Sequence, residues 1–421
     1  MKVLVVGGGG REHAIVWRVI QSPLVTEIYC APGNAGTALM AHNVAIDAHQ
    51  VDRLQAFAVE RGIDLTIIGP EAPLISGLAD GLRRAGRLAF GPGAAGARLE
   101  GSKAWAKELL QKYDIPCARS AAFRDPRAAK EYVLNQPVPV VVKADGLAQG
   151  KGVTVAQTHE EALAAIREAM EQRVFGEAGD AVVVEECLTG PEVSALAFTD
   201  GETVVPMVPA CDYKRVFDGD LGPNTGGMGS YSPPGFVDAA LQERIVTTIL
   251  RPTVAALAAE GIPYRGVLYA GLMLTADGPK VLEFNARFGD PETQVILPRL
   301  RTDLVQICLE VARGRLGEIS VDWDERAACA VVLAAGGYPG SYPKGQQITG
   351  IDDLDEGVYA FHAGTALSGG KFVTAGGRVL ALVGTGGDVA EARAMVYANT
   401  DRVRFDGVHY RRDIGAREVR V

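Results

Sequence analysis

A short strand near residue 283 carries the side chains with the clearest chemical meaning. In the run Val281–Glu292, the polar residues Glu283, Asn285 and Arg287 alternate with apolar ones. Because alternate residues of a strand share one face, these three side chains should point the same way. Carboxylate and amide oxygens suit a Mg²⁺ ion that also binds nucleotide phosphates, and an arginine can grip a carboxylate or phosphoryl group. The apolar residues on the other face favour a packed strand over a solvated polar one.

The segment Gly146–Gly152 is a glycine-rich turn that contains Gly150 and Lys151. It misses the Walker A spacing by one residue and has no Ser or Thr where that motif binds its metal. A glycine hairpin between two antiparallel strands can instead close over a triphosphate, offering backbone N–H donors and a lysine. Lys143, on the strand that leads in, could reach the same phosphates. The pattern favours a phosphate-binding lid over an exposed hairpin tip.

Another glycine-rich run, Asp218–Gly229, contains Asn224 and follows closely after Asp212 and Lys214. The glycines alone would also fit a mobile surface loop. Together with the flanking charges they favour one wall of a substrate site. The acid at Asp212 could there hold an ammonium group.

The N-terminal run Gly7–Gly10, which includes Gly9, follows an apolar strand and opens a helix. Unpaired backbone N–H groups at a helix start favour an anion such as phosphate. The spacing lacks the third glycine of the dinucleotide fingerprint, and the second strand ends without an acid that could hold a ribose hydroxyl. A phosphate or ribose site without NAD is favoured over a tight turn alone.

Glu185 and Glu192 flank a bend at Gly190. An acid and backbone groups at such a bend could hold an adenine amino group and a ribose. Paired acids are common on protein surfaces, so these two residues alone are weak evidence for a nucleotide site.

The elements that must position these residues follow an α/β pattern. Over the first hundred residues, short apolar strands alternate with glycines and helices, which is typical of a parallel sheet whose ligands gather beyond the carboxyl ends of the strands. A connecting helix is expected over Gly101–Tyr113, followed by a compact strand–strand–helix–strand unit. The later elements are expected as a helix near Ala239–Glu260, strands over Val267–Leu274 and Lys280–Phe284, a helix over Pro291–Gly314 and a β-rich block from about Ala327.

Length and composition indicate a soluble enzyme rather than a nucleic-acid-binding or membrane protein. The 421 residues suggest roughly three domains. A net charge of −9 argues against a mainly nucleic-acid-binding chain, and no run approaches the roughly 20 apolar residues of a membrane helix. The six cysteines form no CxxC pair and the six histidines show no metal spacing, so we expect reduced thiols in a cytoplasmic protein. The chain also lacks a GxSxG motif or reactive-cysteine context, which disfavours covalent catalysis by the protein.

Several segments, spread in order over essentially the full length, closely resemble the phosphoribosylamine–glycine ligases (glycinamide ribonucleotide synthetases), a family of ATP-grasp enzymes. Two of them are specific to these ligases, namely Gly222–Gly229 and Leu282–Gln294. The others are Gly7–Ala14, Gly33–Thr37, Gly69–Leu74, Val142–Leu147, Gly337–Gly340 and Phe361–Thr365.

The resemblance implies an α/β ATP-grasp fold with an α+β lid. Its domains would be an N-terminal, Rossmann-like preATP-grasp domain over residues 1–101, a linker helix and lid over 102–189 (the lid itself about 120–189), a central ATP-grasp domain over 190–325 and a C-terminal barrel-like domain over 326–421. The implied reaction joins glycine to 5-phosphoribosylamine, consumes ATP and needs Mg²⁺ or Mn²⁺. The implied partners are small molecules only, with no nucleic acid or membrane, and the chain would be a monomer or a weak dimer.

The resemblance also implies a role for individual residues. ATP would contact Lys103, Lys143, Gly150, Lys151, Glu185, Leu188, Glu192 and Lys214, while Glu283 and Asn285 bind the metal. The substrates would be held by Gly9, Gly10, Glu71, Asp212, Asn224, Arg287 and Asp290. Of these residues, Arg287, Lys143, Lys214 and Asp212 would act in catalysis.

Two departures limit what carries over, and three alternatives stay open. Tyr213 stands where most of the family has histidine, so that position receives no role. The strand Val267–Leu274 lacks the second carboxylate that many other ATP-grasp enzymes have. The ligases of this family lack it too, so the number of magnesium ions stays open. The alternatives are another ATP-grasp carboxylate–amine ligase, a nicotinamide dehydrogenase and a nucleotide sensor without catalysis.

Overall fold

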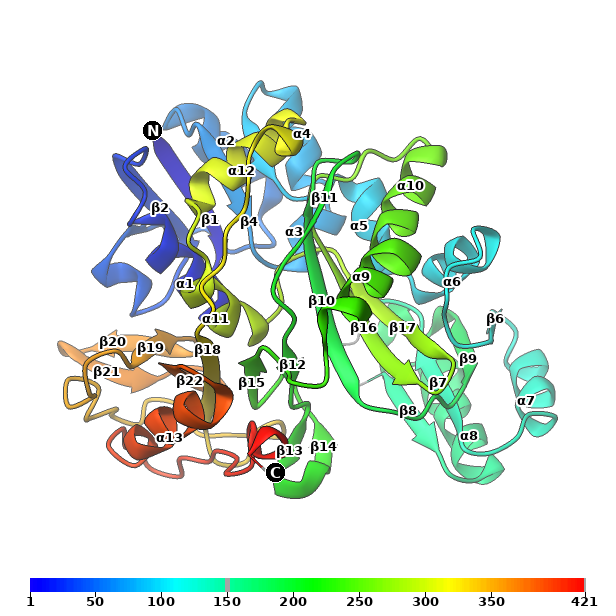
Figure 1. The fold of residues 1–421 in the computed structure, drawn as a ribbon. Coiled ribbons are helices and arrows are strands. Elements are labelled where there is room, and N and C mark those ends of the chain that lie inside the picture. Colours follow the sequence, from blue (N-terminus) through cyan, green and yellow to red (C-terminus); the bar gives the residue numbers. More distant parts are fainter. Residues whose placement is uncertain (148–151, 420–421) are drawn as a thin grey trace.

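The computed structural model describes residues 1–147 and 152–419. The N-terminal domain is built on a five-stranded parallel sheet in the order β3-β2-β1-β4-β5. It is the blue part at the upper left of Figure 1. Its strands are β1 (Lys2–Gly7), β2 (Glu27–Pro32), β3 (His42–Asn43), β4 (Leu65–Ile68) and β5 (Leu88–Phe90). Its helices are α1 (Gly10–Val19), α2 (Val51–Glu60), α3 (Glu71–Ile75), α4 (Leu78–Arg84) and α5 (Ala94–Gly101). The expected parallel α/β sheet is confirmed.

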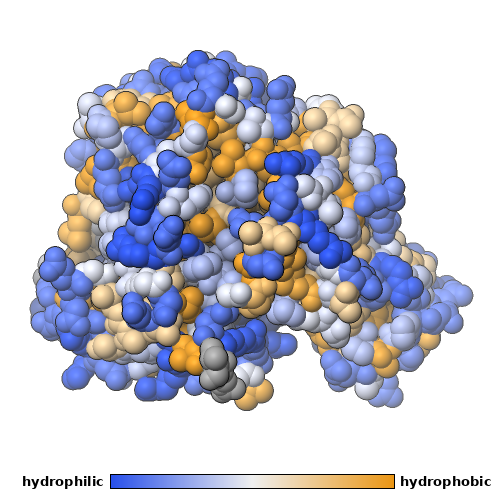
Figure 2. All heavy atoms as spheres, in the orientation of Figure 1, coloured by the Kyte–Doolittle hydropathy of each residue, from blue (hydrophilic) through white to orange (hydrophobic). Residues whose placement is uncertain are grey.

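Helix α6 (Lys103–Lys112) leads into a small subdomain of four antiparallel strands in the order β6-β9-β7-β8, which is the segment expected as the lid and is called by that name below. The lid projects to one side of the molecule in Figure 1, and Figure 2 shows the surface indented between it and the main body. Its elements are β6 (Ser120–Phe123), α7 (Pro126–Leu134), β7 (Val140–Ala144), β8 (Val153–Ala156), α8 (His159–Ile166) and β9 (Val182–Glu186). Asp145, just after β7, accepts a hydrogen bond from the backbone of Ala104 at 3.1 Å, so a lid residue helps to cap α6.

The central sheet has the order β11-β10-β16-β17 and is antiparallel throughout. Its elements are β10 (Glu192–Thr199), β11 (Val204–Pro206), α9 (Ala239–Ile245), α10 (Arg251–Ala259), β16 (Gly266–Thr275) and β17 (Gly278–Asn285). The long antiparallel pair β16–β17 places the predicted acidic strand at the edge of this sheet.

The expectation of one helix over Pro291–Gly314 is wrong. The segment forms two helices, α11 (Glu292–Ile296) and α12 (Leu304–Arg313), separated by a tight 3₁₀ turn over Leu297–Arg299 and an extended residue at Leu300. The Asp303 side chain accepts from the Val305 backbone at 2.8 Å and starts α12 as its N-cap. A proline inside the apolar pattern and a capping aspartate after it therefore divide the helix.

The last part of the chain builds a five-stranded sheet in the order β12-β15-β18-β22-β19, with α13 (Val389–Thr400) packed on β18 and β22. Its strands are β12 (Cys211–Asp212), β15 (Gly229–Ser232), β18 (Ala327–Ala334), β19 (Tyr359–His362) and β22 (Arg378–Gly386). Two hairpins extend from it, β13 (Arg215–Phe217) with β14 (Leu221–Asn224), and β20 (Thr365–Ser368) with β21 (Lys371–Thr374). The β-rich block was expected, but α13 was not. Because β12 and β15 join this sheet, the C-terminal strands are tied directly to the segment that carries Asp212.

Two buried histidines connect the N-terminal domain to the C-terminal sheet. The His362 backbone N–H donates to Nδ1 of His13 at 2.7 Å, and the two rings lie edge to face. Burial lowers the pKa of His13 to about 3 and the pKa of His362 to about 4. Both rings are therefore neutral at pH 7.

This pair predicts a loss of stability in mild acid. An unfolded histidine binds its proton near pH 6.5, whereas the folded rings resist protonation down to about pH 3 and 4. The contribution of these histidines to the free energy of unfolding is therefore fully present above pH 6.5. It decreases as the pH drops, by about 2 kcal/mol per histidine at pH 5. Urea unfolding of wild type and His362→Gln at pH 7 and pH 5 should show a smaller pH effect in the variant. The exposed His49→Gln is the matched control, and an unchanged pH effect in His362→Gln would contradict the assignment.

Within the described residues, no helix is both long and apolar enough to cross a membrane.

Candidate active site

Glu283 lies on β17 at the centre of a group of cations. Burial alone would raise the pKa of this carboxyl, but the nearby ammonium groups of Lys214, Lys143 and Lys103 outweigh burial and lower it. Glu283 is therefore ionised at neutral pH. Lys143 and Lys214 also pair with Glu185 and Glu192, but three ammonium groups gathered at one place still offer partners for an anion such as phosphate.

Arg287 links the acidic strand to the N-terminal domain. Its guanidinium contacts Glu100 at 2.8 Å, Glu71 at 3.2 Å and Oδ1 of Asn285 at 3.0 Å. Arg287 was expected on the same strand as Asn285, but β17 ends at Asn285 and Arg287 contacts it from the bend that follows. Burial would lower the pKa of Arg287, but Glu100 and Glu71 raise it. Three side-chain acceptors and the Phe288 carbonyl at 3.2 Å thus fix the arginine where the acidic strand meets the N-terminal domain.

Lys214, Glu192 and Asp212 form a second charged group close to Glu283. The Lys214 ammonium lies 2.6 Å from Glu192 Oε2 and 3.6 Å from Asp212 Oδ1. Burial raises the pKa of Asp212 to about 7, even though Lys214 opposes the rise. The Lys214 side chain itself remains 36% exposed, so its ammonium is still accessible from solvent.

On the lid side, Lys143 of β7 contacts Glu185 Oε2 and the Leu282 carbonyl, both at 3.0 Å. Lys103, in the first turn of α6, donates to the Gly146 carbonyl at 2.9 Å, and so ties the helix to the start of the glycine hairpin. Leu188 lies half-buried in the connection from β9 to β10, between lid and central sheet. The predicted phosphate ligands Gly150 and Lys151 lie outside the described residues.

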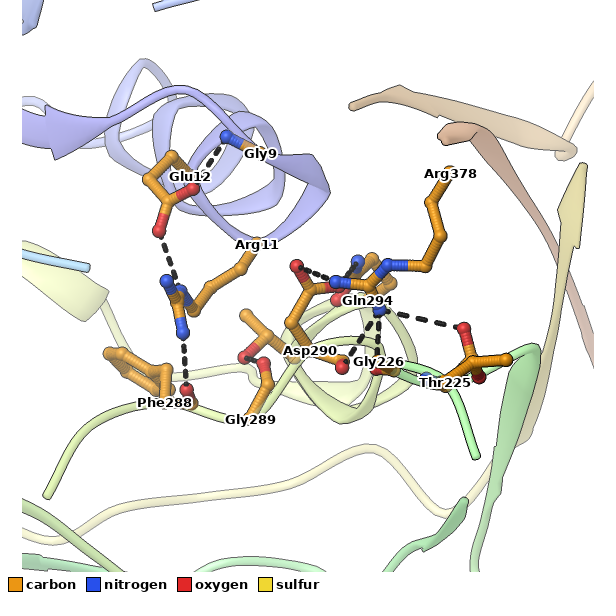
Figure 3. A network of polar contacts seen from close by, with 12 residues as sticks. Gly9, Arg11, Glu12, Thr225, Gly226, Phe288, Gly289, Asp290, Gln294 and Arg378 are labelled. Atoms are coloured by element: carbon orange, nitrogen blue, oxygen red, sulfur yellow. Dashed lines mark hydrogen bonds and ion pairs between the residues drawn. The ribbon is translucent and has the colours of Figure 1, made fainter. Parts of the chain in front are cut away.

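The N-terminal glycine turn meets the C-terminal sheet in the network of Figure 3. The Gly9 backbone N–H donates to Glu12 Oε2 at 2.7 Å, so the helix caps part of its own start. Asp290 lies close to Gly9, because a Cβ built at Gly9 would stand 3.5 Å from its Oδ2. Arg378 of β22 donates to the same oxygen of Asp290 at 2.9 Å and to the Gly226 carbonyl at 2.6 Å.

The other predicted substrate residues lie around this network. Gln294 donates to Asp290 Oδ1 at 2.7 Å. A Cβ at Gly10 would stand only 2.8 Å from the Gln294 amide nitrogen, so a larger residue would push this side chain away. Asn224 ends β14 and is half-buried.

Tyr213, to which the sequence gives no role, is a buried structural contact. The Arg411 guanidinium lies 4.6 Å and that of Arg417 5.6 Å from the centre of its ring. The tyrosine hydroxyl accepts from the Gly415 backbone at 3.1 Å. The C-terminal segment therefore holds the short strand that carries Asp212 in place.

Sequence reasoning missed Lys107, Glu100 and Arg378. Lys107 lies one helical turn after Lys103, and this i, i+4 spacing was the available signal. Glu100 and Arg378 gave no such signal, because their partners lie 187 and 88 residues away. Contacts of that kind are defined only by the folded chain.

The charged groups fit a divalent cation that is bound together with phosphates. Glu283 and Asn285 offer hard oxygen donors on one strand face, as Mg²⁺ requires. In the part of the chain that the structure describes, no group of three or more His, Cys, Asp or Glu side chains could hold a metal. Two protein oxygens plus nucleotide phosphates and water form a normal magnesium site. The residues present therefore fit the group.

Comparison with known protein families gives three consecutive matches along the chain. They are the N domain of phosphoribosylglycinamide synthetase over residues 1–100, its ATP-grasp (A) domain over 101–293 and its C domain over 328–417. The chain belongs to the phosphoribosylglycinamide synthetase family. Similar proteins that match over their full length support this assignment. The phosphoribosylamine–glycine ligase of Caldanaerobacter subterraneus subsp. tengcongensis is 50% identical over 99% of this chain and 100% of its own length. The ligase of that name from a Nostoc species is 51% identical, with 99% of each chain covered.

Solved structures place the synthetase fold among ATP-grasp proteins. The phosphoribosylamine–glycine ligase of Thermotoga maritima matches with a TM-score of 0.85 and 37% identity, covering 98% of this chain and all of that one. The biotin carboxylase of Campylobacter jejuni matches with a TM-score of 0.76 over 97% of this chain and 92% of its own, at 15% identity. At that identity the likeness concerns the fold alone. The predicted ATP-grasp fold is confirmed.

Proposed function

We infer that this chain catalyses the ATP-dependent ligation of glycine to 5-phosphoribosylamine in purine biosynthesis, forming glycinamide ribonucleotide, ADP and phosphate. Full-length relatives named for this activity, at about half identity, support the inference. The structural observation that carries it is the ionised Glu283 surrounded by Lys103, Lys143 and Lys214. Such an arrangement suits transfer of a phosphoryl group from ATP, in which charge must be neutralised rather than a protein nucleophile supplied.

The chemistry follows from the weak reactivity of a carboxylate. A glycine carboxylate oxygen attacks the γ-phosphorus, ADP leaves, and glycyl phosphate forms. The amine nitrogen of phosphoribosylamine then attacks the glycyl carbon, loses a proton and expels phosphate. Lys143 and Lys214 neutralise the charge of the phosphates. Arg287, where the acidic strand meets the N-terminal domain, binds the glycine carboxylate.

Glu283 and Asn285 hold Mg²⁺ or Mn²⁺ in this proposal, and the metal supplies further neutralisation of the phosphate charge. Lys103, Glu185, Leu188 and Glu192 line the nucleotide side. Gly150 and Lys151, which lie outside the described residues, keep the proposed role of ATP contacts. Gly9, Gly10, Glu71, Asn224 and Asp290 face the phosphoribosylamine, while Asp212 accepts the ammonium group of glycine. The lid closes over the phosphates and keeps water from the acyl phosphate.

Substrate-dependent phosphate release tests the proposal. Purified protein with Mg²⁺ and ATP should release phosphate rapidly only when glycine and freshly made phosphoribosylamine are both present. Alanine in place of glycine should give little release. Rapid release that ignores glycine, or turnover with a different amine, would assign the protein to another carboxylate–amine ligation.

A further inference from the structure

A buried cluster joins α6 to the lid and to the acidic strand, and it contains one residue without an assigned role, Lys107, beside Lys143 and Glu185. Glu185 Oε2 lies 3.2 Å from the ammonium of Lys107 and 3.0 Å from that of Lys143. The Lys107 and Lys143 side chains are 7% exposed and the Glu185 side chain 2%. Two ammonium groups thus share one carboxylate oxygen, and within residues 1–147 and 152–419 the other oxygen, Oε1, has no hydrogen-bond partner.

The cluster lies directly beside the strand that carries the metal-binding residues. Lys143 donates to the Leu282 carbonyl at 3.0 Å, while Lys107 approaches the Val281 carbonyl at 3.5 Å. Glu185 lies near the end of β9, where the lid meets the central sheet. The arrangement therefore links the lid and α6 to β17 at the two residues that precede Glu283.

Glu185 has two lysine partners, and this has a consequence for nucleotide binding. Lys143 also lies near Glu283, so of the two lysines Lys107 is the one that Glu185 can keep when Lys143 moves. If Lys143 turns toward an incoming phosphate, Glu185 still keeps Lys107 as its partner. Without Lys107, the same movement would leave a buried carboxylate unpaired, which is strongly unfavourable.

We propose that Lys107 is a positioning residue, which keeps Glu185 paired and in place so that Lys143 is available to the phosphates of the bound nucleotide. This rests on the proposed function only in assigning Lys143 to ATP. Lys107 itself touches no substrate in this proposal. Its buried ammonium, whose pKa burial lowers despite Glu185, serves as a fixed counter-ion.

The test measures Mg²⁺·ADP binding by calorimetry, without glycine or phosphoribosylamine. Lys107→Met should weaken binding tenfold or more, because Lys143 is then the one ion-pair partner left to Glu185 among the described residues. In a Glu185→Gln background the same change should alter the affinity less than twofold, since there is then no buried carboxylate that could lose its partner. Lys112→Met is the matched control, because Lys112 lies on the same helix but pairs with Glu260 at the surface.

A second pair of variants separates charge from packing. Lys107→Arg keeps the positive charge and should bind within threefold of wild type, whereas Lys107→Gln should repeat the loss if the methionine variant does not fold. An equal loss from Lys107→Met in both backgrounds would overturn the proposal, as would unchanged binding in Lys107→Met and Lys107→Gln. If the wild-type protein does not bind Mg²⁺·ADP, that result contradicts the proposed function as well as the proposed role of Lys107.

Discussion

Glu283→Ala is expected to reduce glycine-dependent phosphate release by roughly 10³-fold, or about 4 kcal/mol of barrier. The variant removes the β17 carboxylate whose pKa is lowered by Lys214, Lys143 and Lys103. It also leaves Asn285 as the single protein oxygen of the proposed metal site. The rate should be measured at saturating ATP over a range of Mg²⁺ concentrations, because a lost metal ligand shifts the metal dependence as well as the maximal rate.

Asp277→Ala is the matched control for this prediction. Asp277 is a carboxylate in the turn at the far end of the same β16–β17 hairpin, and its side chain is 83% exposed. Its removal should leave the rate within twofold. More than a tenth of wild-type activity in Glu283→Ala, with an unchanged Mg²⁺ dependence, would show that the acidic strand does not carry the metal.

The parts of the site that the sequence predicted are those with a local signal. Alternation predicted that Glu283, Asn285 and Arg287 share one face. The strand β17 ends at Asn285, and Arg287 contacts Asn285 at 3.0 Å from the bend that follows. Apolar runs followed by glycine turns likewise identified the parallel N-terminal sheet. Both patterns depend only on the period of the strand.

What the sequence did not predict depends on neighbours far away along the chain. Nothing local shows that Arg378 binds Asp290, or that His13 lies against His362. The break between α11 and α12 was missed for a different reason, since the apolar pattern runs on past the proline and obscures Asp303 as the start of a new helix. The role of Lys107 required the fold as well, because its partner lies 78 residues away on the lid.

Arg287→Met is expected to cost stability as well as activity. The arginine is the direct ion-pair partner of Glu100 and Glu71. Its loss would leave a buried carboxylate and its half-buried neighbour facing each other, at a cost of about 3–5 kcal/mol in the free energy of unfolding. Urea unfolding at pH 8 measures this. Arg326→Met, which removes only the exposed contact with Asp324, should cost less than about 1 kcal/mol.

The pH dependence and a double variant show whether charge is the cause. In wild type, Arg287 and Arg11 lower the pKa of Glu71 against the effect of burial, whereas burial raises the pKa of Glu100 despite Arg287. Without the arginine both carboxyls should protonate at higher pH, so the stability difference from wild type should shrink between pH 8 and pH 5. Adding Glu100→Gln to Arg287→Met should restore part of the stability but none of the activity, because the contact to glycine is still missing. A loss independent of pH would instead assign the effect to packing of the arginine stem, and recovery of activity in the double variant would remove Arg287 from the reaction.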